Sequence, residues 1–271
     1  MGAIRNICTF MIDEGDIVLG IAPQFSRFIS EVELQKGIYK YYSLKKEYNY
    51  KFNVKEFIEL VTDDIDMIYI DNPNNPTGQI IELNDIDLIC KISKEKGIYV
   101  LIDEAYGDYM QAENSSINLI NKYNNLIVIK SASKVYGLAS ERVGYVIASE
   151  EIINIYDKVS VPFPFGKSAM TKFIKVLKHR KRYTKKNKKI SKLKKRILES
   201  IDANNYLYTS MESPIFTIKS DRCINLAKEF ANNNIMVEGC ACFVNLDEKY
   251  VRVRINKNYK KMLKNIIKIL K

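Results

Sequence analysis

The feature that most constrains the fold is a series of short apolar runs that alternate with helical patterns between residues 16 and 148. We expect these runs to be strands: DIVLGI (16–21), IDMIYI (65–70), YVLI (99–102), LIVI (126–129) and GYVIA (144–148). Continuous apolar strands separated by helices are typical of a mostly parallel sheet with flanking helices on both faces. The sequence therefore predicts an α/β fold whose ligand lies beyond the carboxyl ends of the strands.

The segment PFPFG (162–166) breaks this alternation, and a long basic helix is expected after it. The remaining pattern predicts strands near 215–219, 236–238 and 250–255, a helix near 223–232, and a final helix from Tyr259. We therefore predict two domains, a large one over residues 1–161 and a smaller C-terminal α+β domain over residues 162–271.

The net charge of +11 is concentrated between residues 172 and 196, where lysine and arginine dominate. Such a run can bind nucleic acid or an anionic membrane. Its apolar residues nevertheless recur at near-helical spacing, which favours a solvated helix with one buried face. They are Ile174, Val176, Leu177, Ile190, Leu193 and Ile197. We therefore expect no nucleic-acid partner, and since no apolar run approaches the roughly 18 residues of a membrane span, no membrane partner either.

Cysteine and histidine usage excludes several classes of site. The five cysteines form no CxxC pair, and His179 is the single histidine. A Cys/His metal cage is therefore not expected, and neither is a Ser-His-Asp or Cys-His hydrolase. Free thiols and the lack of a secretory signal favour a cytoplasmic protein.

Two of the predicted strands end in polar motifs. The first motif, NPNNPTG (72–78), has two prolines and a glycine that fix a tight loop, either as a plain turn or as a rigid support for its asparagines. The second, DEAY (103–106), places a carboxylate at the end of a buried strand, which is costly unless the carboxylate meets a cation. A protonated pyridine nitrogen is such a cation, and a helix cap is the alternative.

A third motif, SASKVYGL (131–138), follows the strand LIVI, and an arginine stands eight positions after its lysine. A lysine at a strand end is often a surface residue. An amine that reacts with a carbonyl must lose its proton, which burial beside positive charge favours, so Lys134 is a candidate for a Schiff base. Ser131, Ser133 and Arg142 are residue types that bind a phosphate group.

The motifs NPNNPTG, DEAY and SASKVYGLASERVGY, in this order, resemble those of the fold type I pyridoxal-phosphate (PLP) enzymes, class I/II aminotransferases, and in particular the histidinol-phosphate aminotransferase group. The resemblance covers essentially the whole chain and departs from the lysine signature at Ser140. It implies PLP as cofactor, an amino acid and a 2-oxo acid as substrates, and a homodimer.

The resemblance also implies a role for each matching residue. Lys134 would hold PLP as a Schiff base and move the proton at the substrate Cα, and Asp103 would pair with the pyridine nitrogen. Asn75 and Tyr106 would hydrogen-bond the phenolic oxygen of the ring. The other residues expected to bind the cofactor are Phe25, stacked on the ring, and Gly2, Ala3, Ser131, Ser133 and Arg142 around its phosphate.

The strand YVRVRI (250–255) resembles the strand whose arginine binds the substrate carboxylate. Aligned in this way, Arg252 is the carboxylate-binding residue, and we expect Arg254 to point to the opposite face of the strand. Arginine suits this role because its guanidinium can form two parallel hydrogen bonds with a carboxylate.

Amino-group transfer is the leading function, with two alternatives. The residues CACF (240–243) before YVRV resemble threonine-phosphate decarboxylases, which share the cofactor residues. Members of the family usually carry several dozen residues before the segment with which this chain begins, including part of the substrate pocket. A truncated, non-catalytic remnant is therefore the second alternative, and we expect cofactor binding to be weaker than in the family.

Overall fold

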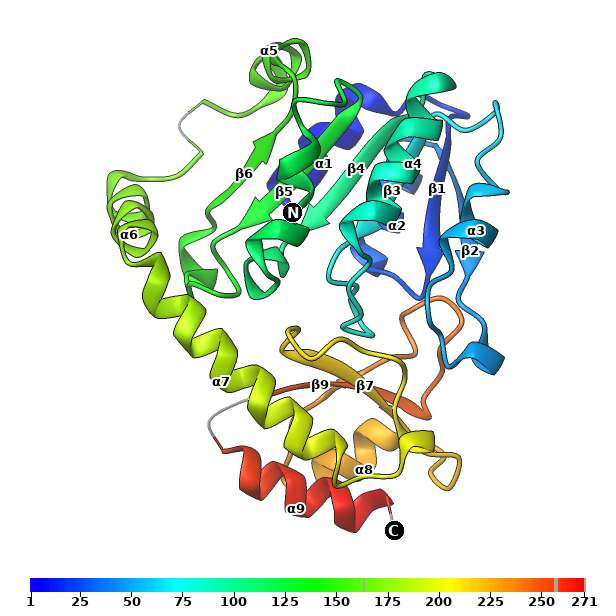
Figure 1. Cartoon of the computed structure of the whole chain (residues 1–271), viewed down its shortest axis with the longest axis vertical. Helices are drawn as coiled ribbons and strands as arrows, with labels where there is room; N and C mark the ends of the chain where they lie inside the picture. Colours follow the sequence, from blue (N-terminus) through cyan, green and yellow to red (C-terminus); the bar gives the residue numbers. More distant parts are fainter. Residues whose placement is uncertain (163, 256–257, 271) are drawn as a thin grey trace.

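The computed structural model describes residues 1–162, 164–255 and 258–270 (Figure 1). Its larger sheet has the strand order β2-β1-β3-β4-β5-β6. All neighbouring strands pair in parallel except β5 and β6, which are antiparallel. The strands are β1 (Ile17–Ala22), β2 (Ile38–Ser43), β3 (Met67–Asp71), β4 (Tyr99–Glu104), β5 (Leu126–Ser131) and β6 (Gly144–Ile147).

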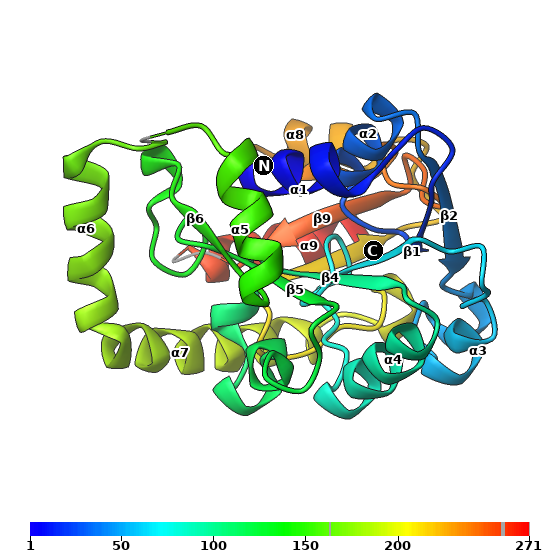
Figure 2. The ribbon, with the colours of Figure 1, turned by 90° about the horizontal axis from the view of Figure 1, so that it is seen from above.

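Helices cover both faces of this sheet (Figure 2). On one face lie α1 (Gly2–Met11), α2 (Ser26–Leu34) and α5 (Glu150–Val159), where Ile7, Phe28 and Leu101 share a buried core. On the other lie α3 (Val54–Ile58) and α4 (Leu83–Glu95), whose Phe57 and Ile86 are buried against the apolar side chains of the same strands. The predicted α/β fold with a mostly parallel sheet is confirmed.

The edge strand β2 is not among the runs expected from the sequence. Its residues, IYKYYS, are mostly exposed, with Tyr42 buried. An edge strand has solvent on one side and tolerates lysine and tyrosine, so it lacks the continuous apolar run that marks the inner strands. Short 3-10 helices join several elements: η1 (Lys46–Tyr48), η2 (Gly107–Tyr109), η3 (Ala112–Asn114), η4 (Ser116–Leu119), η5 (Ala139–Glu141) and η6 (Ala203–Asn205).

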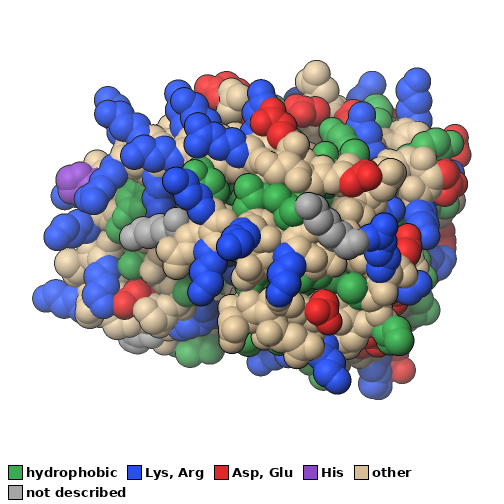
Figure 3. Space-filling view, turned by 90° about the horizontal axis from the view of Figure 1, so that it is seen from below, with side chains coloured by type: hydrophobic (Ala, Val, Ile, Leu, Met, Phe, Trp, Pro, Cys, Tyr) green, Lys and Arg blue, Asp and Glu red, His purple; other side chains and the backbone are tan. Residues whose placement is uncertain are grey.

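The expected long basic helix is two helices, α6 (Lys167–Lys178) and α7 (Arg180–Leu198), with His179 between them. α7 runs from the large domain to the small one, and lysine and arginine side chains spread over the lower face of the molecule (Figures 1 and 3). The apolar residues of α7 face inward: Ile197 is fully buried, and Ile190 packs against the same core. α7 is thus charged on one face and buried on the other, as its spacing predicts. In α6 the prediction is wrong for Ile174 and Leu177, which are exposed.

The small domain has an antiparallel sheet of order β7-β9-β8, made of β7 (Ile215–Lys219), β8 (Glu238–Gly239) and β9 (Tyr250–Arg254). The helices α8 (Leu226–Asn232) and α9 (Tyr259–Leu270) bury Phe230 and Ile266 with Phe216 and Val251 of the sheet. The predicted α+β unit is present. The boundary after residue 161 stays a prediction, and Phe163 of the PFPFG segment lies outside the described residues.

Within the described residues, no helix is long and apolar enough to cross a membrane. The same residues contain no cluster of histidine, cysteine, aspartate or glutamate that could hold a metal ion.

Candidate functional site

The three polar motifs meet at one edge of the large sheet. Strands β3, β4 and β5 are neighbours and run parallel, so the loops that follow them leave the sheet on the same side. The pairing places Asp71 of β3 directly beside Asp103 of β4. The sequence motifs are therefore close in space, as the parallel topology predicts.

Asp103 is a buried carboxylate with neutral partners. It accepts hydrogen bonds from the backbone N–H of Ala105 (2.8 Å) and from the hydroxyl of Tyr69 (3.3 Å), and it is 6% exposed. Burial raises its pKa. No lysine or arginine of the described residues forms an ion pair with it. A cation placed against this carboxylate would therefore stabilise its charged form.

Lys134 extends beside Tyr106, with its Nζ 5.1 Å from the centre of the tyrosine ring. No ion pair or hydrogen bond engages its amine among the described residues. The start of α1 faces the same space: burial lowers the pKa of the Met1 amino group, while the charges of Asp103, Arg142 and Lys134 all act on it. The amino group of Met1, at the start of α1, therefore lies within electrostatic range of Lys134, Asp103 and Arg142.

The residues expected around a phosphate lie on two segments. Ser131 ends β5 and accepts a hydrogen bond from the N–H of Ser133 (3.1 Å). Arg142 follows η5 with a left-handed backbone (φ +56°), and its exposed guanidinium donates to the carbonyl of Ala139 (2.9 Å). Gly2 and Ala3 form the first turn of α1, where backbone N–H groups are left free by the helix and suit an anion.

Asn75 and Arg252 come from different domains and touch. The guanidinium of Arg252 in β9 donates to the side-chain oxygen of Asn75 and also pairs with Glu238. Thr217 of β7 donates to the carbonyl of Pro76 (2.9 Å), which fastens the same loop to the small domain. The predicted carboxylate-binding arginine is therefore held beside the NPNNPTG loop.

The expected direction of Arg254 is wrong. Side chains in a strand alternate with a period of two, so Arg252 and Arg254 lie on the same face, opposite to Val251 and Val253. Arg254 lies beside Tyr109, where its positive charge opposes the rise in the pKa of Tyr109 that burial causes. Both arginines of β9 therefore face the large domain.

Phe25 precedes α2 and packs against the core that contains Phe28 and Tyr69. Phe28 and Tyr69 stack with their ring centres 3.5 Å apart, and the Tyr69 hydroxyl reaches Asp103. The sequence analysis did not single out Tyr69. The signal that could have found it is a tyrosine inside the otherwise apolar run IDMIYI, on the neighbour of the strand that ends in Asp103.

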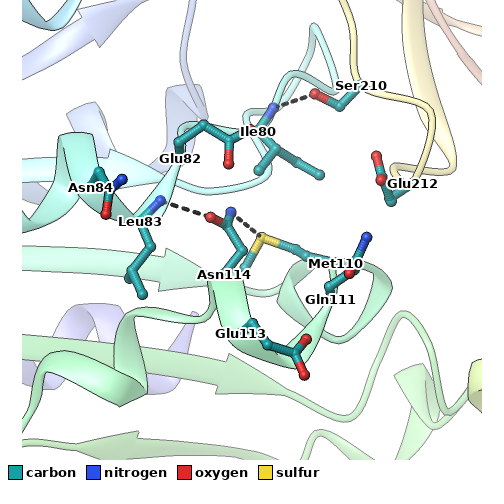
Figure 4. A pocket seen from close by; sticks show the side chains of 10 residues that line it. All are labelled: Ile80, Glu82, Leu83, Asn84, Met110, Gln111, Glu113, Asn114, Ser210 and Glu212. Atoms are coloured by element: carbon teal, nitrogen blue, oxygen red, sulfur yellow. Dashed lines mark hydrogen bonds between the residues drawn. The ribbon is translucent and has the colours of Figure 1, made fainter.

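A pocket of about 400 Å³ lies away from these residues, at the seam between the domains (Figure 4). Asn114 accepts a hydrogen bond from the N–H of Leu83, and Ser210 accepts one from the N–H of Ile80. Three glutamates, Glu82, Glu113 and Glu212, also line it. None of the predicted site residues does, so the pocket is separate from the site at Lys134.

Residues 1–269 match the sequence profile of the family described as aminotransferase class I and II. The chain belongs to this family. It is 28% identical to the histidinol-phosphate aminotransferase of Methanocaldococcus jannaschii, over 97% of this chain and 72% of that protein. It is 30% identical to the enzyme of the same name from Francisella philomiragia, over 89% of this chain and 66% of that protein.

Solved structures have the same fold. The histidinol-phosphate aminotransferase of Clostridium acetobutylicum superposes with a TM-score of 0.83 at 21% identity, over 99% of this chain and 79% of that one. The L-threonine-O-3-phosphate decarboxylase of Porphyromonas gingivalis superposes with a TM-score of 0.82 at 18% identity, over 98% of this chain and 81% of that one. The predicted fold type I is thereby confirmed.

Class I and II aminotransferases are PLP-dependent enzymes, so the predicted family, enzyme class and cofactor are confirmed. The site also fits the group. The buried, unpaired Asp103 suits a cationic ring nitrogen, the free amine of Lys134 suits the cofactor carbonyl, and the exposed Arg142 suits a phosphate. The individual roles of these residues stay predictions.

Replacing Asp103 with asparagine is expected to lower amino transfer at saturating PLP by about 100-fold, since a neutral amide cannot balance a charged ring nitrogen. Steady-state kinetics of the purified variant would measure the loss. Asp87→Asn is the matched control, because Asp87 pairs with Lys122 on the surface of α4. Equal losses in both variants would contradict the assigned role of Asp103.

Proposed function

We propose that this aminotransferase moves the amino group of histidinol phosphate, or of a similar phosphorylated amine, to a 2-oxo acid. The names of its relatives support this donor. The observation that carries the proposal is the contact of Arg252 with Asn75, whose backbone N–H binds Asp71 beside Asp103. It holds an anion-binding guanidinium at the same edge of the sheet as the loop that carries Lys134.

PLP supplies an electron sink for the pair of electrons left when the substrate Cα loses its proton. The amine of Lys134 removes that proton and returns it, so the substrate Cα must lie within hydrogen-bond reach of Nζ. Asp103 would keep a negative charge against the ring nitrogen, Asn75 and Tyr106 would hold the ring oxygen, and Phe25 would cover one face of the ring. The phosphate would be held by Ser131, Ser133, Arg142, Gly2 and Ala3.

Replacing Arg252 with alanine is expected to raise the KM for the 2-oxo acid on the order of 30-fold, because a charge-assisted bidentate contact is lost. The kcat should change less, since Arg252 binds the substrate away from the reacting bond. Initial rates over a range of 2-oxo acid concentrations separate the two constants. Arg27→Ala, at an exposed position of α2, is the control and should leave both constants unchanged.

The family resemblance supports a homodimer, and the free state of the cysteines supports a cytoplasmic location. Cys8, Cys90 and Cys240 are buried thiols, and none of the five cysteines forms a disulfide. Sedimentation equilibrium of the purified protein would test the dimer: a mass of twice the chain supports it, and a mass of one chain contradicts it.

Incubation with histidinol phosphate, 2-oxoglutarate and PLP tests the reaction. Amino transfer predicts equal amounts of the oxo product of the donor and of glutamate. Carbon dioxide release from threonine phosphate, without consumption of oxo acid, would favour the decarboxylase instead. A protein that gains no visible absorbance with PLP would favour the non-catalytic remnant.

A further inference from the structure

A second buried carboxylate stands next to Asp103. Strand β3 ends in Ile70-Asp71 and β4 carries Ile102-Asp103 just before its last residue, and their pairing sets Asp71 beside Asp103 on the same face of the sheet. Asp71 is 4% exposed, and no lysine or arginine of the described residues pairs with it. Burying a carboxylate without an ion pair costs free energy of desolvation, so hydrogen-bond donors must surround it.

Three donors surround Asp71, and all are neutral. The backbone N–H of Asn75 donates to Oδ2 (2.9 Å), and the side-chain amide of Asn74 donates to Oδ1 (2.9 Å). The side-chain amide of Gln24 also donates to Oδ1 (3.3 Å). Asp71 therefore binds the backbone of Asn75, and the side chain of Asn75 accepts a hydrogen bond from Arg252.

The same contacts reach the loop that carries Phe25. The amide of Asn74 also donates to the carbonyl of Pro23 (3.1 Å). Gln24 donates to the carbonyl of Tyr69 (3.1 Å) and accepts from the N–H of Ile21 (3.2 Å). The loops after β1 and β3 are thus joined to each other through one carboxylate.

We propose that Asp71 is a positioning residue that fixes the loops of Phe25 and Asn75 at the cofactor site. It touches neither PLP nor substrate and acts through the amides of Gln24, Asn74 and Asn75. The inference rests on the proposed contacts of Phe25 and Asn75 with the cofactor ring, but not on the identity of the amino donor.

The surroundings of Asp71 make its hold on the loops depend on pH. Burial raises its pKa to about 7, against the hydrogen bonds from Asn75 and Asn74, and the charge of Asp103 adds to the rise. The other titratable groups that face it are Tyr69 and Tyr39, and burial raises the pKa of both, so they stay neutral. Because burial makes the closed loops bind this proton more tightly than an opened segment in which Asp71 meets water, protonation below pH 7 should favour the closed loops.

Amide hydrogen exchange of the protein without PLP tests the proposal independently of turnover. In Asp71→Asn, the protection factors of residues 72–78 should fall by at least about tenfold. In the wild-type protein they should not fall as the pH drops below 7, because the proton favours the closed loops, and in the variant they should not depend on pH in this range. The dissociation constant for PLP should rise by about tenfold, a cost of roughly 1.4 kcal/mol.

Asp66→Asn is the matched control, because Asp66 stands at the other end of the same chain segment and accepts from the N–H of Ile17 (2.7 Å). Wild-type protection of residues 72–78 in Asp71→Asn would overturn the proposal. Should that variant not fold, Asn74→Ala decides: unchanged protection and unchanged PLP affinity overturn it. A loosened loop in a protein whose wild type does not transaminate histidinol phosphate would refute the proposed donor alone.

Discussion

Replacing Lys134 with alanine is expected to lower amino transfer by at least about a thousandfold, because the residue supplies both the amine for the cofactor carbonyl and the base for the Cα proton. Steady-state rates at saturating PLP would measure the loss, and the visible absorbance that wild-type protein gains with PLP should change. Lys122→Ala removes a lysine that pairs with Asp87 at the surface, and it should behave as wild type.

A nearby lysine cannot take over this role. Lys130, four residues earlier on β5, is buried and pairs with Glu104 (3.1 Å) and Asp108 (3.3 Å). Its Nζ is engaged by two carboxylates, whereas the amine of Lys134 has no such partner within the described residues. Activity retained in Lys134→Ala would therefore contradict the assignment, since the neighbouring amine is already engaged.

The inner strands of the large sheet were predictable because burial on both faces leaves a continuous apolar run. The end of α4 was predictable as well, since Gly97 adopts the left-handed backbone (φ +75°) that favours glycine. The edge strand β2 and the break at His179 were not. Strand β2 has solvent on one side and lacks a continuous apolar run. The break at His179 interrupts a basic segment whose apolar spacing fits a single helix.

The cofactor side of the site was predictable because its motifs follow parallel strands, whose ends meet without knowledge of the rest of the fold. The contact of Arg252 with Asn75 was not, since it depends on how the small domain packs against the large one. Tyr69 lies inside an apolar run that is typical of a buried strand, and Asp71 directly follows this run. The strand pairing shows that both residues lie beside Asp103, which the sequence alone does not show.

The burial of Lys194 was not predictable either, because it lies among many lysines of α7, and a lysine in such a basic run is usually exposed. It is fully buried, and burial lowers its pKa. Its Nζ, with three N–H donors, lies within hydrogen-bond distance of four oxygens of the loop 209–215: the Thr209 hydroxyl (2.6 Å) and the carbonyls of Ser210 (2.7 Å), Ser213 (3.1 Å) and Ile215 (2.7 Å). The loop is therefore closed around one positive charge.

The loop 209–215 in turn supports the NPNNPTG segment. The N–H of Ser210 donates to the carbonyl of Gly78 (3.2 Å), and its hydroxyl accepts from the N–H of Ile80 (2.9 Å). Gly78 has a left-handed backbone (φ +73°), and a Cβ there would lie 2.1 Å from the carbonyl oxygen of Ile215. The two segments are packed so closely that a disturbance of one should reach the other.

Replacing Lys194 with methionine is expected to lower the free energy of unfolding by about 3 kcal/mol, because several buried oxygens lose their donor at once. Urea unfolding followed by circular dichroism would measure the change. Lys195→Met is the matched control: Lys195 is exposed and, among the residues that the structure describes, forms an ion pair with Glu199 alone, so its loss should change the free energy by less than about 0.5 kcal/mol. If the Lys194→Met protein is as stable as the wild type, the free energy lost on burying the ammonium equals the free energy gained from its hydrogen bonds. In that case the charge would serve to shape the loop beside Gly78 rather than to stabilise the fold, and PLP affinity would fall without a loss of stability.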